Sequence, residues 1–344
     1  MEGRLVSTNL ATYIHDVSGL LQENGQVDAI YTDFQKAFDK VNHDLLLMKM
    51  ENIGFSRKLL TFFKSYLMGR QQYVEYRGEK SNLIKCTSGV PQGSNLGPFL
   101  FLIFINDLTL HISFSNILMY ADDIKLYMKI NSAVDVGKLQ ADVDAIAEWS
   151  TNNHLPLNID KRVKITFTRK KLPLQKTYQI HNINLKDVFS VRDLGILIDS
   201  RLTYTLHFSQ IINNAKRLLG FLMSNGRELK CTETLKVLYY TLVRSQLEFA
   251  TVVWSPTTEN WIGAIESIQK RFLKYLYYRT FHYYPCYPMQ VAYTELLQGF
   301  QIPSLQSQRS MISLLFLQDI IQGRIKASEL LGYVKLYVPS FQAR

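Results

Sequence analysis

Acidic residues stand where strand-like segments end or turn in the first half of this chain. Residues 27–34 (VDAIYTDF) form a short apolar pattern that reaches Asp33. Residues 116–130 (NILMYADDIKLYMKI) hold two apolar stretches with Asp122 and Asp123 between them. Short stretches rich in β-branched and aromatic residues are typical of strands, and a tight turn between two of them is typical of a hairpin. The sequence therefore predicts an antiparallel sheet, with Asp33 and the 120–123 turn meeting at one edge.

Segments with helical periodicity lie before, between and after these predicted strands. Apolar residues recur at helical spacing over 44–68, broken at Gly54, and over 135–150, where Ser132 and Asp135 form a capping box. The other predicted elements are a hairpin of 71–77 with 82–87, a Gly/Pro loop over 89–97, a helix over 98–110, a strand over 163–168, a strand pair within 187–200, and helices over 206–223, 232–250 and 260–280. This order predicts an α+β fold, with an antiparallel sheet backed by helices and a helical region after it.

Charge is divided unevenly along the chain. Residues 1–150 hold 14 Lys and Arg against 17 Asp and Glu, and residues 151–344 hold 25 against 12. A basic second half is typical of a polyanion-binding surface, and a solvated basic face is the alternative. The longest apolar run, Phe99–Ile105, is far shorter than the ~20 residues of a membrane span. Because the N-terminus also has no apolar signal core, we expect an intracellular protein that makes no membrane contact.

The three carboxylates are candidate metal ligands. Mg²⁺ takes oxygen ligands, usually one or two carboxylates together with substrate phosphates. Adjacent residues on an extended turn point in different directions, so we expect one of Asp122 and Asp123 to bind metal beside Asp33 while the other supports it. Two ions ~3.5–4 Å apart would act on the attacking and leaving oxygens of an in-line phosphoryl displacement. A solvated hairpin turn is the alternative interpretation of the acidic pair.

Five segments together resemble the reverse transcriptase of non-LTR (LINE-type) retrotransposons, nearest to jockey-like elements. In chain order they are DFQKAFDKV (33–41), SGVPQGSNLGPFLFLIFINDL (88–108), YADD (120–123), LNIDK (157–161) and VRDLGILID (191–199). Two later segments, LVRSQLEFATVVWSP (242–256) and IESIQKRFLKY (265–275), are similar to the region that follows the polymerase core in such elements. The resemblance implies the right-hand polymerase fold, with a palm followed by a helical thumb and a C-terminal extension.

The resemblance also implies an activity and its metal site. The activity is that of an RNA-directed DNA polymerase, a nucleotidyltransferase that joins dNTPs to a primer 3′-hydroxyl. Asp33, Asp122 and Asp123 would bind two Mg²⁺ ions, with Mn²⁺ as an alternative metal. Lys161, in the fourth motif, would lie near the leaving phosphate as a charge stabiliser or proton donor.

Nucleotide-binding residues follow from the same resemblance. Phe38 matches the aromatic steric gate, whose ring would clash with a ribose 2′-hydroxyl and so favour dNTPs. Gln92 matches a residue that lies along the nucleotide and template. Gly93, which has no Cβ, would let the backbone approach the substrate closely.

Basic residues and partners complete the expectations. The nucleic-acid contacts are predicted at Lys164, Arg169, Lys170, Lys171, Lys270, Arg271 and Lys274. The implied partners are an RNA template, a DNA primer or target DNA, and dNTPs, while the oligomeric state stays open. The life cycle of such elements implies the nucleus as the site of action.

The resemblance divides the chain into a remnant of the fingers (1–30), the palm (31–200) and a helical thumb with a C-terminal extension (201–344). In the family a fingers subdomain precedes the first motif, so the chain is expected to be N-terminally truncated. This leaves open the alternative of a catalytically inactive, retrotransposon-derived remnant that at most binds RNA. The intron-encoded maturase lineage also carries YADD, but the segments at 242–256 and 265–275 argue against it.

Overall fold

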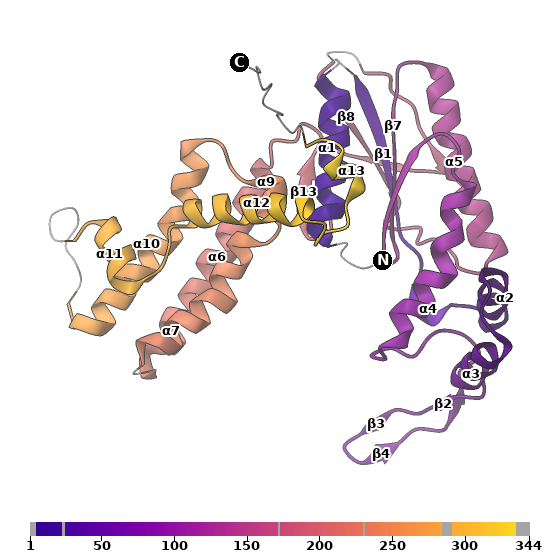
Figure 1. Cartoon of the computed structure of the whole chain (residues 1–344), viewed down its shortest axis with the longest axis horizontal. Coiled ribbons are helices and arrows are strands. Elements are labelled where there is room, and N and C mark those ends of the chain that lie inside the picture. The colour runs from indigo at the N-terminus through magenta and orange to yellow at the C-terminus, as the bar shows by residue number, and fades with distance from the viewer. Residues whose placement is uncertain (1–4, 23–24, 171–172, 230, 284–290, 335–344) are drawn as a thin grey trace, which may run out of the picture. The chain divides into compact units, whose positions relative to one another are not determined.

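The computed structural model describes residues 5–22, 25–170, 173–229, 231–283 and 291–334 of the chain (Figure 1). Its contacts separate into two compact units. Val17–Phe189 form the first, called here the sheet unit, and Met1–Asp16 with Ser190–Arg344 form the second, called here the helical unit. Helix α1 (Val6–Gln22) runs through the division. Within the described ranges, no helix is long and apolar enough to cross a membrane.

The sheet unit is built on a five-stranded sheet of order β11-β8-β1-β7-β6. Its central strand β1 (Gln26–Thr32) is antiparallel to β7 (Asp123–Lys129) and to β8 (Val163–Thr168). At the two edges, β6 (Asn116–Tyr120) is antiparallel to β7 and β11 (Lys186–Val188) is parallel to β8. The predicted antiparallel sheet is confirmed, with one parallel pair at the β11 edge.

The other elements of the sheet unit follow the predicted order closely. They are α2 (His43–Ile53), α3 (Arg57–Leu67), β2 (Gln71–Gln72), β3 (Glu75–Tyr76), β4 (Glu79–Lys80), β5 (Ile84–Lys85), α4 (Leu96–Ile105), α5 (Ala133–Asn152), β9 (Gln179–Ile180) and β10 (Ile183–Asn184), with 3₁₀ turns at Ala37–Asp39 and Asn106–His111. The predicted hairpin at 71–87 is confirmed, because β2 pairs with β5 and β3 pairs with β4.

Local capping explains where these helices begin and end. Gly54, with φ of 100°, ends α2, and its N–H bonds carbonyls of the last turn, as a left-handed C-cap residue does. The Ser56 side chain accepts a hydrogen bond from the Leu59 N–H and starts α3. Ser132 and Asp135 form the predicted capping box at the start of α5. Gly54 and Ser56 therefore divide the segment 44–68 into two helices, although helical periodicity extends over the whole segment.

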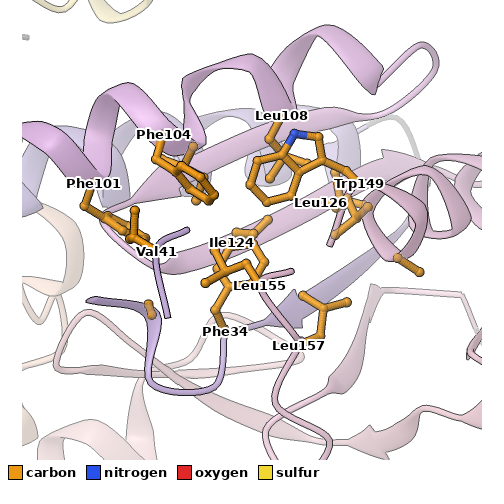
Figure 2. Close-up of a cluster of buried hydrophobic side chains, with 14 of the residues drawn as sticks. Phe34, Val41, Phe101, Phe104, Leu108, Ile124, Leu126, Trp149, Leu155 and Leu157 are labelled. Carbon is orange, nitrogen blue, oxygen red and sulfur yellow. The ribbon is translucent and has the colours of Figure 1, made fainter. Parts of the chain in front are cut away.

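The core of the sheet unit lies between the sheet and helices α4 and α5 (Figure 2). Phe101 and Phe104 from α4 and Trp149 from α5 lie over Ile124 and Leu126 of β7. All five side chains are at most 2% exposed. Burying a large apolar side chain contributes about 1.5–3 kcal/mol, so this layer holds β7, and the acidic turn before it, in a fixed position.

A buried polar network joins three helical segments to this core. The Lys49 ammonium on α2 donates to the Phe104 carbonyl (2.8 Å) and to the Asp107 carboxylate (2.8 Å). The Trp149 indole N–H donates to the same carboxylate (3.1 Å). Burial is the main influence on the pKa of Lys49 and lowers it, while Asp107 opposes that effect. The network therefore fixes the helices to one another by satisfied hydrogen bonds.

The helical unit contains the strand pair β12–β13 followed by helices. Its elements are β12 (Ser190–Asp193), β13 (Ile196–Asp199), α6 (Thr205–Asn225), α7 (Thr232–Leu238), α8 (Ser245–Glu248), α9 (Thr251–Trp254), α10 (Glu259–Phe281), α11 (Tyr293–Phe300), α12 (Leu305–Ile321) and α13 (Ser328–Leu331), with a 3₁₀ turn at Gly226–Glu228. The helix predicted over 232–250 is interrupted by a π-helical turn at Tyr239–Arg244. The helical spacing of Trp261, Ile265, Ile268, Phe272 and Leu276 predicts one apolar face of α10. The last four of these residues are buried, and Trp261 is half-buried.

The structural division falls at Ser190, so the strand pair at 190–199 groups with the helices that follow it. The resemblance instead places these strands in the palm, which it predicts over residues 31–200. The assignment of fingers remnant, palm and thumb stays a prediction.

Candidate active site

Asp33 stands one residue beyond the C-terminal end of the central strand β1 and is 5% exposed. The Lys161 ammonium forms a hydrogen-bonded ion pair with its Oδ2. Its Oδ1 is buried, and within the described part of the chain it has no hydrogen-bond partner. Burying an oxygen atom of a carboxylate without a donor is costly. Asp33 therefore retains one oxygen that a cation would satisfy.

The acidic turn is a two-residue hairpin. Tyr120 pairs with Asp123, so Ala121 and Asp122 form the turn between β6 and β7. Ala121 has φ of 52°, a left-handed conformation that costs a residue with a Cβ about 1–2 kcal/mol. Strain of this kind is concentrated at functional sites. In this turn the strain accompanies the placement of the Asp122 carboxyl against Asp33.

The pKa of the Asp122 carboxyl is shifted by its burial and by its position beside Asp33 and Lys161. Partial burial is the largest influence and raises the pKa of the Asp122 carboxyl. A hydrogen bond from its own backbone N–H lowers it, and the negative charge of Asp33 raises it. A hydrogen bond between the two carboxyls raises it further, while Lys161 lowers it. Two ionised carboxylates cannot share a hydrogen bond, because each can only accept one. The Asp33 and Asp122 carboxyls therefore need a proton or a cation between them.

Lys161 reaches this pair from a loop that is bound to the segment after β1. The Asn158 N–H donates to the Asp33 carbonyl (2.7 Å), and the Gln35 N–H donates to the Pro156 carbonyl (2.8 Å). The hydrogen bond with Asp33 is the main influence on the pKa of Lys161 and raises it. The charges of Asp123 and Asp122 act in the same direction. The lysine is therefore a cation held at the carboxylates, although its own side chain is 64% exposed.

Asp123 is placed differently from the other two acids. It is the first residue of β7 and is exposed, whereas Asp33 and Asp122 are in hydrogen-bond contact. No group of three or more His, Cys, Asp or Glu side chains in the described ranges is arranged to hold a metal ion. The donor set still fits Mg²⁺, which usually takes one or two carboxylates and completes its shell with phosphate and water oxygens. The unpartnered Asp33 oxygen beside Asp122 is the observation that supports this fit.

We predict that Asp122→Asn unfolds at a higher denaturant concentration than the wild type at pH 7 without divalent metal. The raised pKa means that the folded state holds the Asp122 proton more tightly than the unfolded state. The Asp122 proton therefore stabilises the folded wild type at acid pH. This stabilisation is lost as the pH rises from about 4 through the raised pKa of Asp122. Urea unfolding between pH 3.5 and 7.5 measures this. A difference that is constant over that range, or that grows at acid pH, contradicts the prediction.

The loop at 88–97 is bound to the segment that follows Asp33. The Gly89 N–H donates to the Val41 carbonyl (2.8 Å), and the Val90 N–H donates to the Phe38 carbonyl (2.8 Å). The Gln92 side-chain amide donates to the Asp39 carboxylate (2.8 Å). These contacts hold the predicted nucleotide-binding residue Gln92 beside the first motif. Asp39, a residue of the first motif from which the motif pattern predicts mainly structural hydrogen bonds, orients Gln92.

The other two predicted nucleotide-binding residues lie on the same two segments. Phe38 is half-buried and stacks on Phe101 with ring centroids 4.6 Å apart. Gly93 has φ of 78°, and a Cβ added there would meet no atom within 4 Å. The left-handed backbone therefore explains the glycine locally. The open space beside it is compatible with the predicted close approach of a substrate.

One predicted nucleic-acid contact does not fit its surroundings. Lys164 is 4% exposed, and its ammonium donates to the Lys176 carbonyl (2.8 Å) and pairs with Asp187 (2.9 Å). Because the residue lies on the interior side of β8, it cannot reach a phosphate, and this prediction is corrected. Part of the basic segment 161–171 belongs to β8, in which Lys164, Ile165 and Phe167 are buried, and counting charges does not reveal this burial.

The remaining predicted contacts stay predictions. Arg169 and Lys170 are exposed after the end of β8. On α10, Lys270 and Arg271 are exposed, whereas Lys274 is half-buried. The seventh residue, Lys171, lies outside the described residues.

Comparisons with known proteins identify relatives of this chain. The sequence profile of the family described as "Reverse transcriptase (RNA-dependent DNA polymerase)" matches residues 5–198. An "RNA-directed DNA polymerase from mobile element jockey" of Drosophila funebris is 27% identical over 265 residues, which cover 74% of this chain and 29% of that relative. The jockey polymerase of Drosophila melanogaster is 31% identical over 189 residues, covering 53% of this chain and 20% of the relative. The chain thus spans less than a third of the curated relatives that it matches.

A solved structure is also similar. The apo telomerase of Candida tropicalis aligns with a TM-score of 0.45 and 13% identity, over 80% of this chain and 46% of the telomerase.

Proposed function

The chain belongs to the reverse transcriptase family, and we propose that it carries the polymerase core of a non-LTR retrotransposon enzyme. In this proposal it adds dNTPs to a primer 3′-hydroxyl as directed by an RNA template. The observation that carries the proposal is the contact between Asp33 and Asp122 at one end of the central strand, with Lys161 bound to Asp33. Asp33, Asp122 and Lys161 come from three of the five motifs. Along the chain, Asp122 is 89 residues and Lys161 is 128 residues from Asp33.

The residues have distinct roles in the proposed reaction. Two Mg²⁺ ions held by Asp33, Asp122 and Asp123 would supply charge stabilisation to the attacking and leaving oxygens of the phosphoryl transfer. Asp33 presents its unpartnered oxygen, and Lys161 keeps a positive charge beside it. Catalysis in this class of reaction is mostly positioning and electrostatics, so a fixed pair of acids with a lysine cation bound beside it suits the reaction. We further propose that the enzyme acts in the nucleus on target DNA, as the family implies.

Primer extension on RNA tests the proposal. The purified chain is incubated with an RNA template, an annealed DNA primer, the four dNTPs and Mg²⁺. We expect products that lengthen to the end of the template and that are absent without template or metal. RNA binding without extension by the folded chain would overturn the proposal and would identify an inactive remnant instead.

Phe38 gives a separate prediction about sugar selection. We expect Phe38→Val to raise incorporation of NTPs relative to dNTPs by about 100-fold, because the ring that would meet a 2′-hydroxyl is removed. Phe38→Tyr keeps the ring that stacks on Phe101 and serves as the matched control. Single-nucleotide insertion with dCTP and CTP measures the ratio. Equal ratios in the wild type and in Phe38→Val would exclude Phe38 as the steric gate.

A further inference from the structure

A groove of about 570 Å³ lies behind the loop that carries Lys161. Its volume is within the usual range for small-molecule sites, roughly 300–1,000 Å³. It is formed by the C-terminal turn of α5, the 156–162 loop and the β9–β10 hairpin, all within the sheet unit. The residues that line it include His154, Ile159, Arg162, His181 and Ile183. None of these lining residues is acidic, so the groove favours an anion.

Arg162 is the strongest element of this groove. It is 5% exposed, and within the described ranges its guanidinium makes one long hydrogen bond, from Nη1 to the Ile180 carbonyl (3.4 Å). Burial lowers the pKa of its guanidinium, and the negative charge of Asp160 opposes that effect. A buried guanidinium has five donors and is costly to bury unless a negative group pairs with it. Arg162 is therefore an incompletely paired cation that lines an open groove.

The rest of the groove supplies surfaces for a flat, partly apolar body. The Ile159 side chain is 61% exposed and the Ile183 side chain is 47% exposed, unusually open positions for isoleucine. His154 and His181 are exposed, and both have positive φ (53° and 51°), in turns on either side of the groove. Imidazole rings stack on nucleic-acid bases as other aromatic side chains do.

We propose that this groove binds a nucleoside phosphate, with the phosphate on the Arg162 guanidinium and the base and sugar against Ile159, Ile183 and the imidazoles. Planar, bidentate recognition of phosphate is the contact that arginine makes best. The site is distinct from the carboxylates, because Lys161 is bonded to Asp33 while its neighbour Arg162 is bonded to the Ile180 carbonyl. The proposal goes beyond the polymerase activity and does not depend on it. The phosphate belongs either to a free nucleotide or to a single strand.

Calorimetric titration of the full chain with deoxyadenosine monophosphate tests the proposal. The buffer contains EDTA, so that the carboxylate pair holds no divalent metal and repels the phosphate. We expect binding by the wild type that weakens at least about 10-fold in Arg162→Gln, since a bidentate charged contact is lost. Arg77→Gln, at an exposed arginine on the hairpin of the same unit, is the matched control and should bind as the wild type does.

A second variant keeps the test valid if Arg162→Gln fails to fold. Ile159→Asp places a negative charge at an exposed position of the groove, so folding is preserved while affinity for the phosphate falls at least about 5-fold. Arg162→Gln itself should unfold at a temperature equal to or above that of the wild type, because an underpaired buried charge is removed. Wild-type affinity in both variants, or a wild type that binds no nucleotide, would overturn the proposal.

Three further titrations define the ligand. Inorganic phosphate should bind more weakly than the nucleotide, because it lacks the body that the apolar rim contacts. An octamer of deoxythymidine that displaces the nucleotide identifies a strand as the source of the phosphate, and failure to displace it identifies the free nucleotide. A peptide of eight glutamates that binds in an Arg162-dependent manner, while the nucleotide does not, would contradict the nucleoside class.

Discussion

Asp33→Asn is expected to reduce the rate of primer extension by about 1,000-fold or more, a loss of about 4 kcal/mol of transition-state stabilisation. The change keeps the shape of the side chain and removes its charge. Asp33 contributes the buried oxygen that no donor satisfies, and its carboxylate acts on the pKa of the neighbouring Asp122 carboxyl. An amide in its place offers one weak acceptor and a donor group that repels a cation. Rapid single-nucleotide insertion with Mg²⁺ measures the effect.

The three acids should differ in a defined order. Asp122→Asn should match Asp33→Asn, since the two carboxyls are in contact. Asp123→Asn should lower the rate less, because this residue is exposed and leaves the Asp33–Asp122 pair intact. Asp144→Asn, at an exposed position on α5, is the control and should retain the wild-type rate. Activity in Asp33→Asn within 10-fold of the wild type would contradict the assigned role.

Gly89→Ala is expected to destabilise the fold by about 3 kcal/mol or more and to abolish extension. Gly89 has φ of 83°, and a Cβ built there would lie 2.6 Å from the Asp39 carbonyl oxygen. Its own carbonyl accepts hydrogen bonds from the His43 imidazole (2.8 Å) and the Arg70 guanidinium (2.8 Å). The added methyl group therefore has to move the backbone that carries Asp39, the partner of Gln92.

Gly93→Ala is the matched control for this second prediction. Gly93 also has a left-handed backbone, with φ of 78°, but a Cβ there meets no atom within 4 Å. The cost should be the backbone strain alone, about 1–2 kcal/mol. Urea unfolding of the two variants compares them directly. If both lose the same free energy of unfolding, the close contact of Gly89 with Asp39 does not hold the two segments together.

Much of the sheet unit could be predicted because its local signals agree with one another. The break at Gly54, the capping box at Ser132 and the strand pattern around Asp122 each act through neighbouring residues, and each is confirmed. The meeting of Asp33 with the acidic turn is expected from the motifs, although it depends on the antiparallel pairing of β1 with β7, which lie far apart in the chain. Secondary structure can be predicted from sequence where the local preferences agree with the overall fold.

Features that depend on distant contacts could not be predicted in this way. Lys164 is a charged residue within a basic run, and only its pairing with Asp187 shows that it is interior. The parallel pairing of β11 with β8 joins segments whose patterns are equally compatible with other arrangements. The sequence does not distinguish Arg162 from the other basic residues, because the groove that it lines is assembled from separate segments. Burial of charge is decided by tertiary contacts, which composition does not report.

A double-mutant cycle on Asp33 and Asp122 tests the central claim most directly. The rate of insertion of one dNTP on an RNA template is measured for the wild type, Asp33→Asn, Asp122→Asn and the double variant. If the two carboxyls act together on one metal-dependent step, the double variant should be within about 10-fold of either single variant, because groups that act as a unit are not additive. Single variants that keep wild-type rates, or losses that multiply in the double variant, would contradict the claim.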